Sequence, residues 1–273
     1  MRWFPLLLAA ALGLVVLFLT VPIVAIFANT APGDLLSSLG DASARDALRL
    51  SLETSAIALA VIVVAGTPAA YLLATKEFRG RALVVTLIEL PLVLPPAVAG
   101  IALLAAFGAG GLLGDDLRHA GIVLPFGQWA VVLAVTFVAS PFYLRQAIAS
   151  FEGVDAGLVD AARTLGASPA RTFWRVALPL AGSGLVAGWV LAFARGIGEF
   201  GATIIFAGNV QGRTTTLTLA VYQQLDVDID VALALGVVLL ALSAGVLVSY
   251  KLVGGWRRSS LTSPAAFAAS PST

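Results

Sequence analysis

Six apolar segments dominate this sequence, and each is long enough to cross a lipid bilayer as a helix. An apolar helix of about 20 residues spans the roughly 30 Å hydrocarbon layer. Only 11% of the residues are charged and 59% are hydrophobic, whereas soluble domains carry roughly 25% charged residues. The chain is therefore predicted to be an all-α membrane protein with six transmembrane helices, near residues 3–28, 50–75, 82–107, 128–150, 183–207 and 229–252.

The distribution of basic residues predicts the orientation of these helices. Cytoplasmic loops of membrane proteins carry an excess of Lys and Arg. With a cytoplasmic N-terminus, the inner side holds most of the 16 Lys and Arg residues, including Arg145. Both termini and the loop at residues 151–180 are therefore predicted to be cytoplasmic. The segment 257–273 is rich in Ser, Ala, Pro and Thr, which predicts a disordered cytoplasmic tail.

The chain lacks the residues that several functional classes require. The chain has no cysteine and a single histidine, His119, so no metal site is predicted. Its net charge of +1 gives no basis for binding nucleic acid. No G-x-x-x-x-G-K-[ST] phosphate loop is present, so ATP hydrolysis by this chain is not expected. The G-x-G-x-x-G run at residues 196–201 lies in an apolar span with no preceding strand, so we expect helix packing there.

The cytoplasmic loop carries signals for two short helices. Asp155 can cap the first helix, and Gly166 can end it in a left-handed conformation. Ser168 can cap the second helix, with Pro169 in its first turn. Pro179 is expected to end the second helix before the fifth span. One face of the first helix is apolar and consists of Leu158, Ala161, Ala162 and Leu165.

Two interpretations of this loop differ in what the apolar face contacts. A helix on the membrane surface would bury bulky apolar residues there, and alanines serve that purpose poorly. Small side chains instead allow another backbone to approach closely, and Arg163, Arg171 and Arg175 offer charges to a partner. The loop is therefore predicted to dock onto another protein.

The same loop resembles the signature of bacterial ABC importer permeases. That signature is Glu-Ala-Ala, three residues, Gly, nine residues, Ile, one residue and Leu-Pro. Here Asp160-Ala161-Ala162 is followed by Gly166 and by Val176-Ala177-Leu178-Pro179 with every spacing matched. Asp160 replaces Glu and Val176 replaces Ile, and both replacements are conservative.

The resemblance implies a type I importer fold over residues 1–256, in the cytoplasmic membrane of a bacterium or archaeon. It implies a homodimer of this chain, two cytoplasmic ATP-binding subunits that hold ATP and Mg²⁺, and an extracytoplasmic oxyanion-binding protein. The chain itself is expected to bind no cofactor and to catalyse no reaction. The residues expected to couple the permease to the ATPase are Asp155, Asp160, Ala161, Ala162, Gly166, Ala167 and Pro179.

Other segments resemble molybdate permeases, namely residues 89–104, 191–203 and 206–209. The resemblance implies import of molybdate, but sulfate, thiosulfate and tungstate permeases share much of the pattern. In the outer segment that follows, Arg213 and the threonines beside it can contact the anion or shape a surface turn. A more remote alternative is a secondary anion carrier or channel, which would need no docking loop.

Three charged residues are expected inside the spans, where each is costly unless it faces protein or water. They are Glu89, Arg195 and Glu199. One interpretation is an internal ion pair in which Arg195 and Glu199 of the fifth span meet Glu89 of the third. The alternative is that these side chains line or gate the pathway.

Prolines and outer acids each leave two interpretations open. Pro91, Pro95 and Pro96 are expected to kink the third span, either as part of a gate or for packing. The outer loops carry aspartates that serve solubility and topology or form a docking rim for a soluble partner outside. These residues are Asp34, Asp41, Asp46, Asp115, Asp116, Asp226, Asp228 and Asp230.

Overall fold

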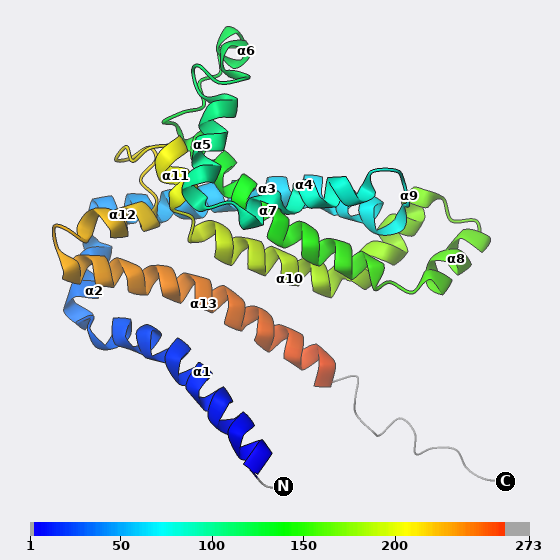
Figure 1. Cartoon of the computed structure of the whole chain (residues 1–273), viewed down its shortest axis with the longest axis horizontal. Coiled ribbons are helices and arrows are strands. Elements are labelled where there is room, and N and C mark those ends of the chain that lie inside the picture. Colours follow the sequence, from blue (N-terminus) through cyan, green and yellow to red (C-terminus); the bar gives the residue numbers. More distant parts are fainter. Residues whose placement is uncertain (1–2, 260–273) are drawn as a thin grey trace.

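The computed structural model describes residues 3–259, and helices connected by loops make up this part of the chain (Figure 1). The elements are α1 (Trp3–Ala28), α2 (Pro32–Gly40), α3 (Ala42–Thr75), α4 (Arg81–Val93), α5 (Pro96–Phe107), α6 (Gly114–His119), α7 (Gln128–Glu152), α8 (Ala156–Thr164), α9 (Pro169–Thr172), the π-helical turn η1 (Phe173–Ala177), α10 (Leu178–Ile197), α11 (Gly201–Phe206), α12 (Leu217–Gln224) and α13 (Ile229–Ser259). Within residues 3–259 no strand is present.

In the described part of the chain, five helical segments are long and apolar enough to cross a membrane, and a sixth crossing exists if α4 and α5 form one broken span. The predicted all-helical membrane fold is confirmed. Two predicted spans are wrong in detail. The third is not continuous, because α4 and α5 meet at an angle of 118°. The fifth ends at Ile197 rather than near residue 207, and a separate helix, α11, follows.

The C-terminal boundary also differs from the prediction. Helix α13 continues to Ser259, so residues 257–259 are helical rather than part of a disordered tail. The rest of the predicted tail lies outside the described residues. Arg145, which the sequence counts among the inner-side basic residues, lies in the C-terminal part of α7.

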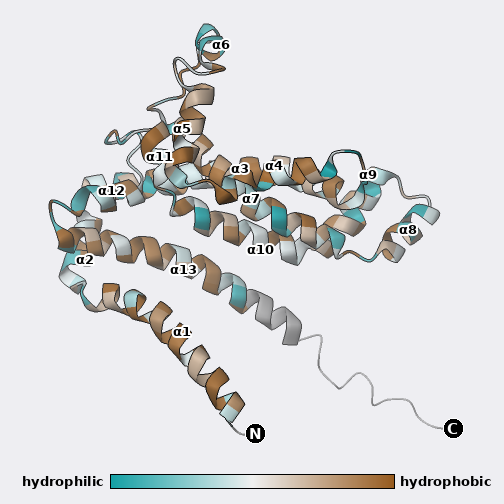
Figure 2. Ribbon diagram, in the orientation of Figure 1, coloured by the Kyte–Doolittle hydropathy of each residue, from teal (hydrophilic) through white to brown (hydrophobic). Residues whose placement is uncertain are grey.

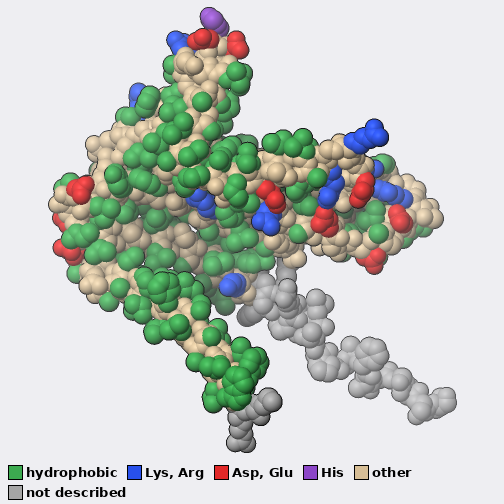
Figure 3. Space-filling model, in the orientation of Figure 1, with side chains coloured by type: hydrophobic (Ala, Val, Ile, Leu, Met, Phe, Trp, Pro, Cys, Tyr) green, Lys and Arg blue, Asp and Glu red, His purple; other side chains and the backbone are tan. Residues whose placement is uncertain are grey.

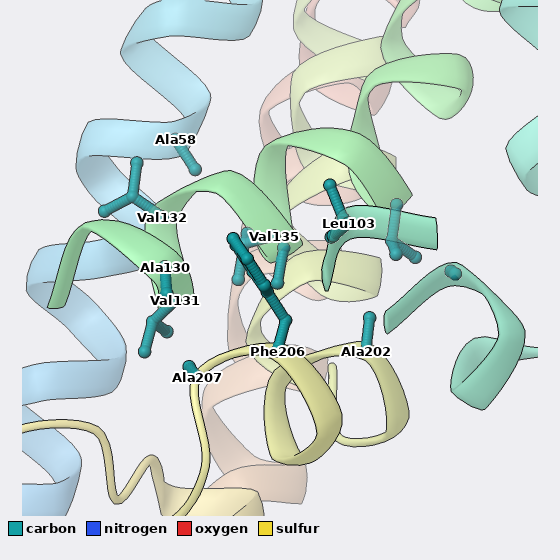
Figure 4. Close-up of a cluster of buried hydrophobic side chains, with 12 residues drawn as sticks. Ala58, Leu103, Ala130, Val131, Val132, Val135, Ala202, Phe206 and Ala207 are labelled. Atoms are coloured by element: carbon teal, nitrogen blue, oxygen red, sulfur yellow. The ribbon is translucent and has the colours of Figure 1, made fainter. Parts of the chain in front are cut away.

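The centre of the bundle is α7, which packs between α3 and α10. Small residues make this close packing possible. A Cβ at Gly188 of α10 would lie 3.1 Å from Cβ of Gln146, and one at Gly196 would lie 2.9 Å from Cγ1 of Val135. Figure 4 shows Val135 of α7 beside Phe206 and Ala202 of α11. The buried core therefore joins the long helices to the short ones.

Polar side chains also fasten the helices together inside the apolar bundle. The Thr67 hydroxyl of α3 and the Tyr143 hydroxyl of α7 are 2.5 Å apart. At the start of α12, the backbone N–H of Leu217 donates to Oγ of Ser51 in α3 at 2.7 Å. Hydrogen bonds between helices satisfy groups that hydrocarbon would leave unpaired.

The surface of the bundle suits a lipid environment. Helix α1 has no buried residue and is apolar on all sides. Figure 2 shows hydrophobic residues over most of α1 and along α13, with hydrophilic residues concentrated in α6 and around α8 and α9. Helices α8 and α9 lie at one end of the long helices, and α2 and α12 lie at the other (Figure 1). The apolar lengths of the long helices separate these two ends.

Close packing of α5 on α11 leads to a stability prediction. A Cβ at Gly100 would lie 2.7 Å from Cβ of Ile205 and 3.0 Å from the Ala202 carbonyl oxygen. We expect Gly100→Ala to destabilise the protein by about 1–3 kcal/mol through overpacking. The measurement is the melting temperature of the purified protein in detergent. The control is Gly182→Ala in α10, where a Cβ meets nothing within 4 Å; an equal fall for both variants would contradict the packing argument.

Candidate functional site

Helix α8 begins and ends as its sequence predicts. Oδ1 of Asp155 accepts a hydrogen bond from the Gly157 N–H at 2.8 Å, which caps the N-terminus. Gly166 has φ of +84°, a conformation that L side chains rarely adopt. The N–H groups of Gly166 and Ala167 donate to the carbonyls of Arg163 and Ala162 at 2.9 and 3.0 Å. This pair of bonds is a Schellman motif, which ends a helix without orphaned carbonyls.

The outward surface of α8 has no partner within the described chain. None of its nine residues is buried, and it packs mainly against α9 and η1. Leu158 is 50% exposed, and Leu165 at its end is 88% exposed. Figure 1 shows α8 projecting from the end of the bundle. Asp160 and Ala161 are exposed and Ala162 is partly exposed, so the signature residues are available to another protein.

An aromatic cluster lies at the base of this loop. Tyr71 of α3 contacts Phe151 of α7 and Phe173 of η1, with ring centroids 5.3 and 4.8 Å apart. Edge-to-face and tilted pairs of this kind stabilise packing beyond their buried area. The cluster joins the ends of α3 and α7 to the segment that follows α8. No local sequence pattern identifies these residues, because their contacts connect segments far apart in the chain.

An arginine makes a second connection at the same end. Nε of Arg81 donates to the Leu73 carbonyl at 2.7 Å, and its Nη2 lies 2.7 Å from Oε1 of Glu152. Arg81 is the first residue of α4, and it thereby binds both the C-terminal end of α3 and the last residue of α7. Arg81 therefore joins α3, α4 and α7 at the base of the loop that carries α8.

The path from the loop into the membrane differs from the prediction at Pro179. Ser168 caps α9 through a 3.3 Å bond from the Arg171 N–H, as expected. Pro179 does not end that helix, because α9, η1 and α10 form one continuous segment. Pro179 lies in the first turn of α10, directly after the wider π-helical turn. Such a turn changes the local i→i−4 pattern and accommodates a residue without an N–H.

The broken third span owes its bend to two of its three prolines. Helix α4 continues through Pro91 to Val93, whereas Pro95 is the N-cap of α5 and Pro96 is its first residue. Proline cannot donate the hydrogen bonds that would continue α4, but it suits a first helical turn. The chain therefore stops one helix and starts another here, and α5 packs against α11. A gating role for these prolines stays a prediction.

A buried carboxylate occupies the second break, between α10 and α11. Oε1 of Glu199 accepts from the Ala202 N–H at 2.8 Å, and Oε2 lies 2.6 Å from Nη2 of Arg195. This second contact is an ion pair, and Oε2 has no hydrogen-bond partner among the described residues. The hydroxyl of Thr218 donates to the Glu199 carbonyl at 2.8 Å. The expected ion pair of Arg195 and Glu199 is thus present in the structure.

Glu89 does not join that pair, and the predicted three-residue network is wrong. Its Oε1 lies 3.0 Å from Nε of Arg145 in α7. Both side chains are partly exposed, at 38% for Glu89 and 63% for Arg145. Glu89 pairs with Arg145 and not with Arg195 because α4, which carries Glu89, packs against α7. Within residues 3–259, Glu89 and Glu199 thus belong to two separate ion pairs, one with a buried carboxylate and one with both side chains exposed.

The threonines after Arg213 shape a turn. The hydroxyl of Thr214 accepts from the Val210 N–H at 2.8 Å, and that of Thr215 donates to Oδ1 of Asn209 at 2.7 Å. Thr214 is fully buried, whereas Arg213 is exposed.

Among the described residues, no group of three or more His, Cys, Asp or Glu side chains could hold a metal ion.

Known proteins are similar to this chain over most of its length. Residues 62–258 match the family described as "Binding-protein-dependent transport system inner membrane component". The molybdenum transport system permease protein ModB of Mycobacterium tuberculosis is 44% identical over 235 residues, which cover 85% of this chain and 88% of that protein. The sulfate transport system permease protein CysW of a Synechocystis species is 34% identical over 249 residues, 90% of each chain.

A solved structure has a similar fold. It is the crystal structure of a bacterial alginate ABC transporter in complex with a periplasmic protein that holds an alginate pentasaccharide. The TM-score is 0.73 and the sequence identity 16%, with 90% of this chain and 92% of that chain covered. The likeness at this identity concerns the fold.

The buried ion pair leads to a prediction about stability. Arg195→Ala leaves the carboxylate of Glu199, whose side chain is 1% exposed, without its counter-charge. Removing one partner of a buried pair costs about 3–5 kcal/mol, so we expect a marked fall in the melting temperature in detergent. Arg195→Ala combined with Glu199→Gln should recover most of the loss, because the amide oxygen can still accept from Ala202.

Glu89→Gln is the control for this experiment, because it breaks the more exposed pair and should change the melting temperature less. Equal damage in the single and double Arg195 variants would contradict the role of the charge pair.

Proposed function

The chain belongs to the binding-protein-dependent transport system inner membrane components, and we propose that it carries molybdate in an ATP-driven importer. It is a multi-pass inner-membrane permease subunit of an ABC importer, a class in which separate subunits hydrolyse ATP. The higher identity to a molybdenum permease, 44% against 34% for a sulfate permease, supports this cargo.

The observation that carries the coupling role is the unpartnered, capped helix α8. We place α8 in contact with an ATP-binding subunit on the cytoplasmic side, with both termini of the chain on that side. The excess of Lys and Arg on this side supports the orientation. Two copies of the chain would enclose one pathway, with one ATPase subunit bound to each copy.

The mechanism we propose is a shift between two conformations that distant ligands favour unequally. ATP binding would draw the two α8 helices together. The aromatic cluster and Arg81 would pass this movement to α3, α4 and α7, and the continuous α9–η1–α10 segment would pass it toward the break at Glu199. ATP hydrolysis would return the transporter to its first conformation.

Sulfate, thiosulfate and tungstate remain alternative cargoes within the same mechanism. Sulfate and tungstate are tetrahedral dianions like molybdate, and no residue of this chain distinguishes them by chemistry alone. The selection is therefore assigned to the extracytoplasmic binding protein that delivers the anion. A secondary carrier, the more remote alternative, would not use α8.

Uptake into proteoliposomes tests the cargo. The permease is reconstituted with its ATPase subunit and binding protein, and molybdenum accumulated in the presence of internal ATP is measured by mass spectrometry. We expect ATP-dependent molybdate uptake that a tenfold excess of sulfate leaves mostly intact. Preferred uptake of sulfate would show that sulfate, and not molybdate, is the cargo. Uphill uptake by vesicles that contain this chain alone would contradict the whole mechanism.

A substitution on α8 tests the coupling role. Ala161→Trp places a bulky ring on the exposed face of α8, where close approach of a partner needs a small side chain. We expect at least a tenfold loss of ATPase subunit in co-purification, with insertion into the membrane unchanged. The matched control is Ala82→Trp on the exposed face of α4. Stoichiometric co-purification with Ala161→Trp would rule out docking through this face.

A further inference from the structure

Two ion pairs lie in line along the contact between α4 and α7. Arg81 of α4 pairs with Glu152 of α7 at 2.7 Å, and Glu89 of α4 pairs with Arg145 of α7 at 3.0 Å. The two helices therefore run antiparallel here, and the second pair lies seven residues along α7, or about 10 Å, from the first. We call these four residues the charged seam. Figure 3 shows acidic and basic side chains next to one another over the long helices, amid hydrophobic ones.

The charged seam is open on the surface of the single chain. The side chain of Arg145 is 63% exposed and that of Glu89 is 38% exposed. Ala149, one turn after Arg145 on the same face of α7, is exposed as well. Its small side chain leaves the space between the two ion pairs open to whatever faces this surface.

Lipid is a poor neighbour for such a surface. Charged side chains within membrane segments face protein or water, because hydrocarbon does not solvate them. Two other exposed helices of the chain follow this rule. Helix α1 carries no charged residue from Trp3 to Ala28, and α13 carries none between Asp230 and Lys251. The charged seam departs from this pattern on an equally exposed surface, which indicates that it faces water or a second protein.

The deeper ion pair offers its cation more readily than its anion. Its contact uses Nε of Arg145, and the guanidinium has further N–H groups on both Nη atoms. Such a planar fork can donate to two oxygens of a tetrahedral oxyanion. At the first pair the carboxylate is the more exposed partner, with Glu152 at 48% and Arg81 at 33%. An anion that follows the seam is therefore attracted most strongly at Arg145.

The break between α10 and α11 lies further along the same central helix. A Cβ at Gly196 of α10 would lie 2.9 Å from Cγ1 of Val135 and 3.6 Å from Cβ of Ala139 in α7. Ala139 is six residues before Arg145, or about 9 Å along α7. Basic groups therefore occur at three successive levels along α7, at Arg195 beside the break, at Arg145 and at Arg81.

We infer that Arg145 contacts the oxyanion during its passage, and that each of two copies of the chain presents one Arg145 to it. This inference rests on the proposed function. Two guanidinium groups match the charge of a dianion, and one copy alone supplies only half of that charge. Glu89 holds Arg145 in position and offsets part of its attraction. Binding is then weak enough for the anion to leave, as transport requires.

ATP-driven uptake into proteoliposomes tests the role of Arg145. The permease is reconstituted with its ATPase subunit and binding protein, and molybdate uptake and ATP hydrolysis are measured together. We expect Arg145→Gln to lower the uptake per ATP hydrolysed by about tenfold or more, because the anion loses its cationic contact. The matched control is Arg79→Gln, the same chemical change at an exposed arginine two residues before α4, which should keep wild-type uptake.

A double variant separates an anion contact from a purely structural ion pair. Arg145→Gln combined with Glu89→Gln replaces the charged pair by two amides that can hydrogen-bond to each other. The melting temperature should return close to that of wild type, while uptake should stay low. Recovery of uptake in the double variant would show that only the pairing matters, and would overturn the inference.

The remaining outcomes distinguish this inference from the proposed function. Equal uptake by Arg145→Gln and Arg79→Gln would overturn the inference alone. Sulfate uptake with the same dependence on Arg145 would support the contact and change the cargo, because sulfate is also a tetrahedral dianion. Absence of ATP-driven oxyanion uptake by the wild type would instead contradict the proposed function.

Thiol accessibility tests the surroundings of the seam without measuring transport. The natural chain has no cysteine, so Ala149→Cys places a unique thiol on the face of α7 that carries Arg145. We expect this thiol to react with a charged, water-soluble methanethiosulfonate about tenfold or more faster than that of Val16→Cys, on the exposed apolar surface of α1. Equally slow reaction of both variants would place the seam against lipid or in a dry interface, and would overturn the inference.

Discussion

Hydrocarbon offers no hydrogen bonds to an exposed backbone, and this constraint governs the two places where membrane helices break. At the break between α10 and α11, the side chain of Glu199 supplies a hydrogen-bond partner for the exposed backbone. Its carboxylate caps α11 through the Ala202 N–H and lies against the guanidinium of Arg195. Thr218 binds the carbonyl of the same residue. The helix can break here because the Glu199 carboxylate pairs with both the Ala202 N–H and the guanidinium of Arg195.

The two breaks meet in the folded chain. A Cβ at Gly201, the first residue of α11, would lie 2.6 Å from Cβ of Pro96, the first residue of α5. Two short helices thus begin at one point of contact, and Gly100 lets them continue side by side. Helix α5 follows α4 and helix α11 follows α10, so this contact joins the ends of two different membrane segments. The arrangement suits a permease that alternates between two conformations.

Helix α3 connects the two ends of the bundle physically. At one end, Tyr71 and Arg81 join the loop that carries α8 to the long helices. At the other end, α12 is hydrogen-bonded to Ser51 of α3 and to the Glu199 carbonyl. Helix α3 takes part in both sets of contacts, so it can transmit displacement between the two ends.

Local chemistry explains which features the sequence by itself determined. The apolar lengths determined the helical membrane fold, and Asp155, Gly166 and Ser168 determined where α8 begins and ends and where α9 begins, because capping depends on residues a few positions apart. The ion pair of Arg195 with Glu199 was also readable, since these residues are four apart.

Only the tertiary structure decided the partners that come from distant segments. It assigned Glu89 to Arg145 instead of Arg195, and it brought Tyr71, Phe151 and Phe173 together. It also divided the third and fifth spans, where apolar composition alone suggested continuous helices. Apolarity determines that a segment enters the membrane, but its direction and its contacts depend on which neighbouring helix satisfies its charges and broken backbone.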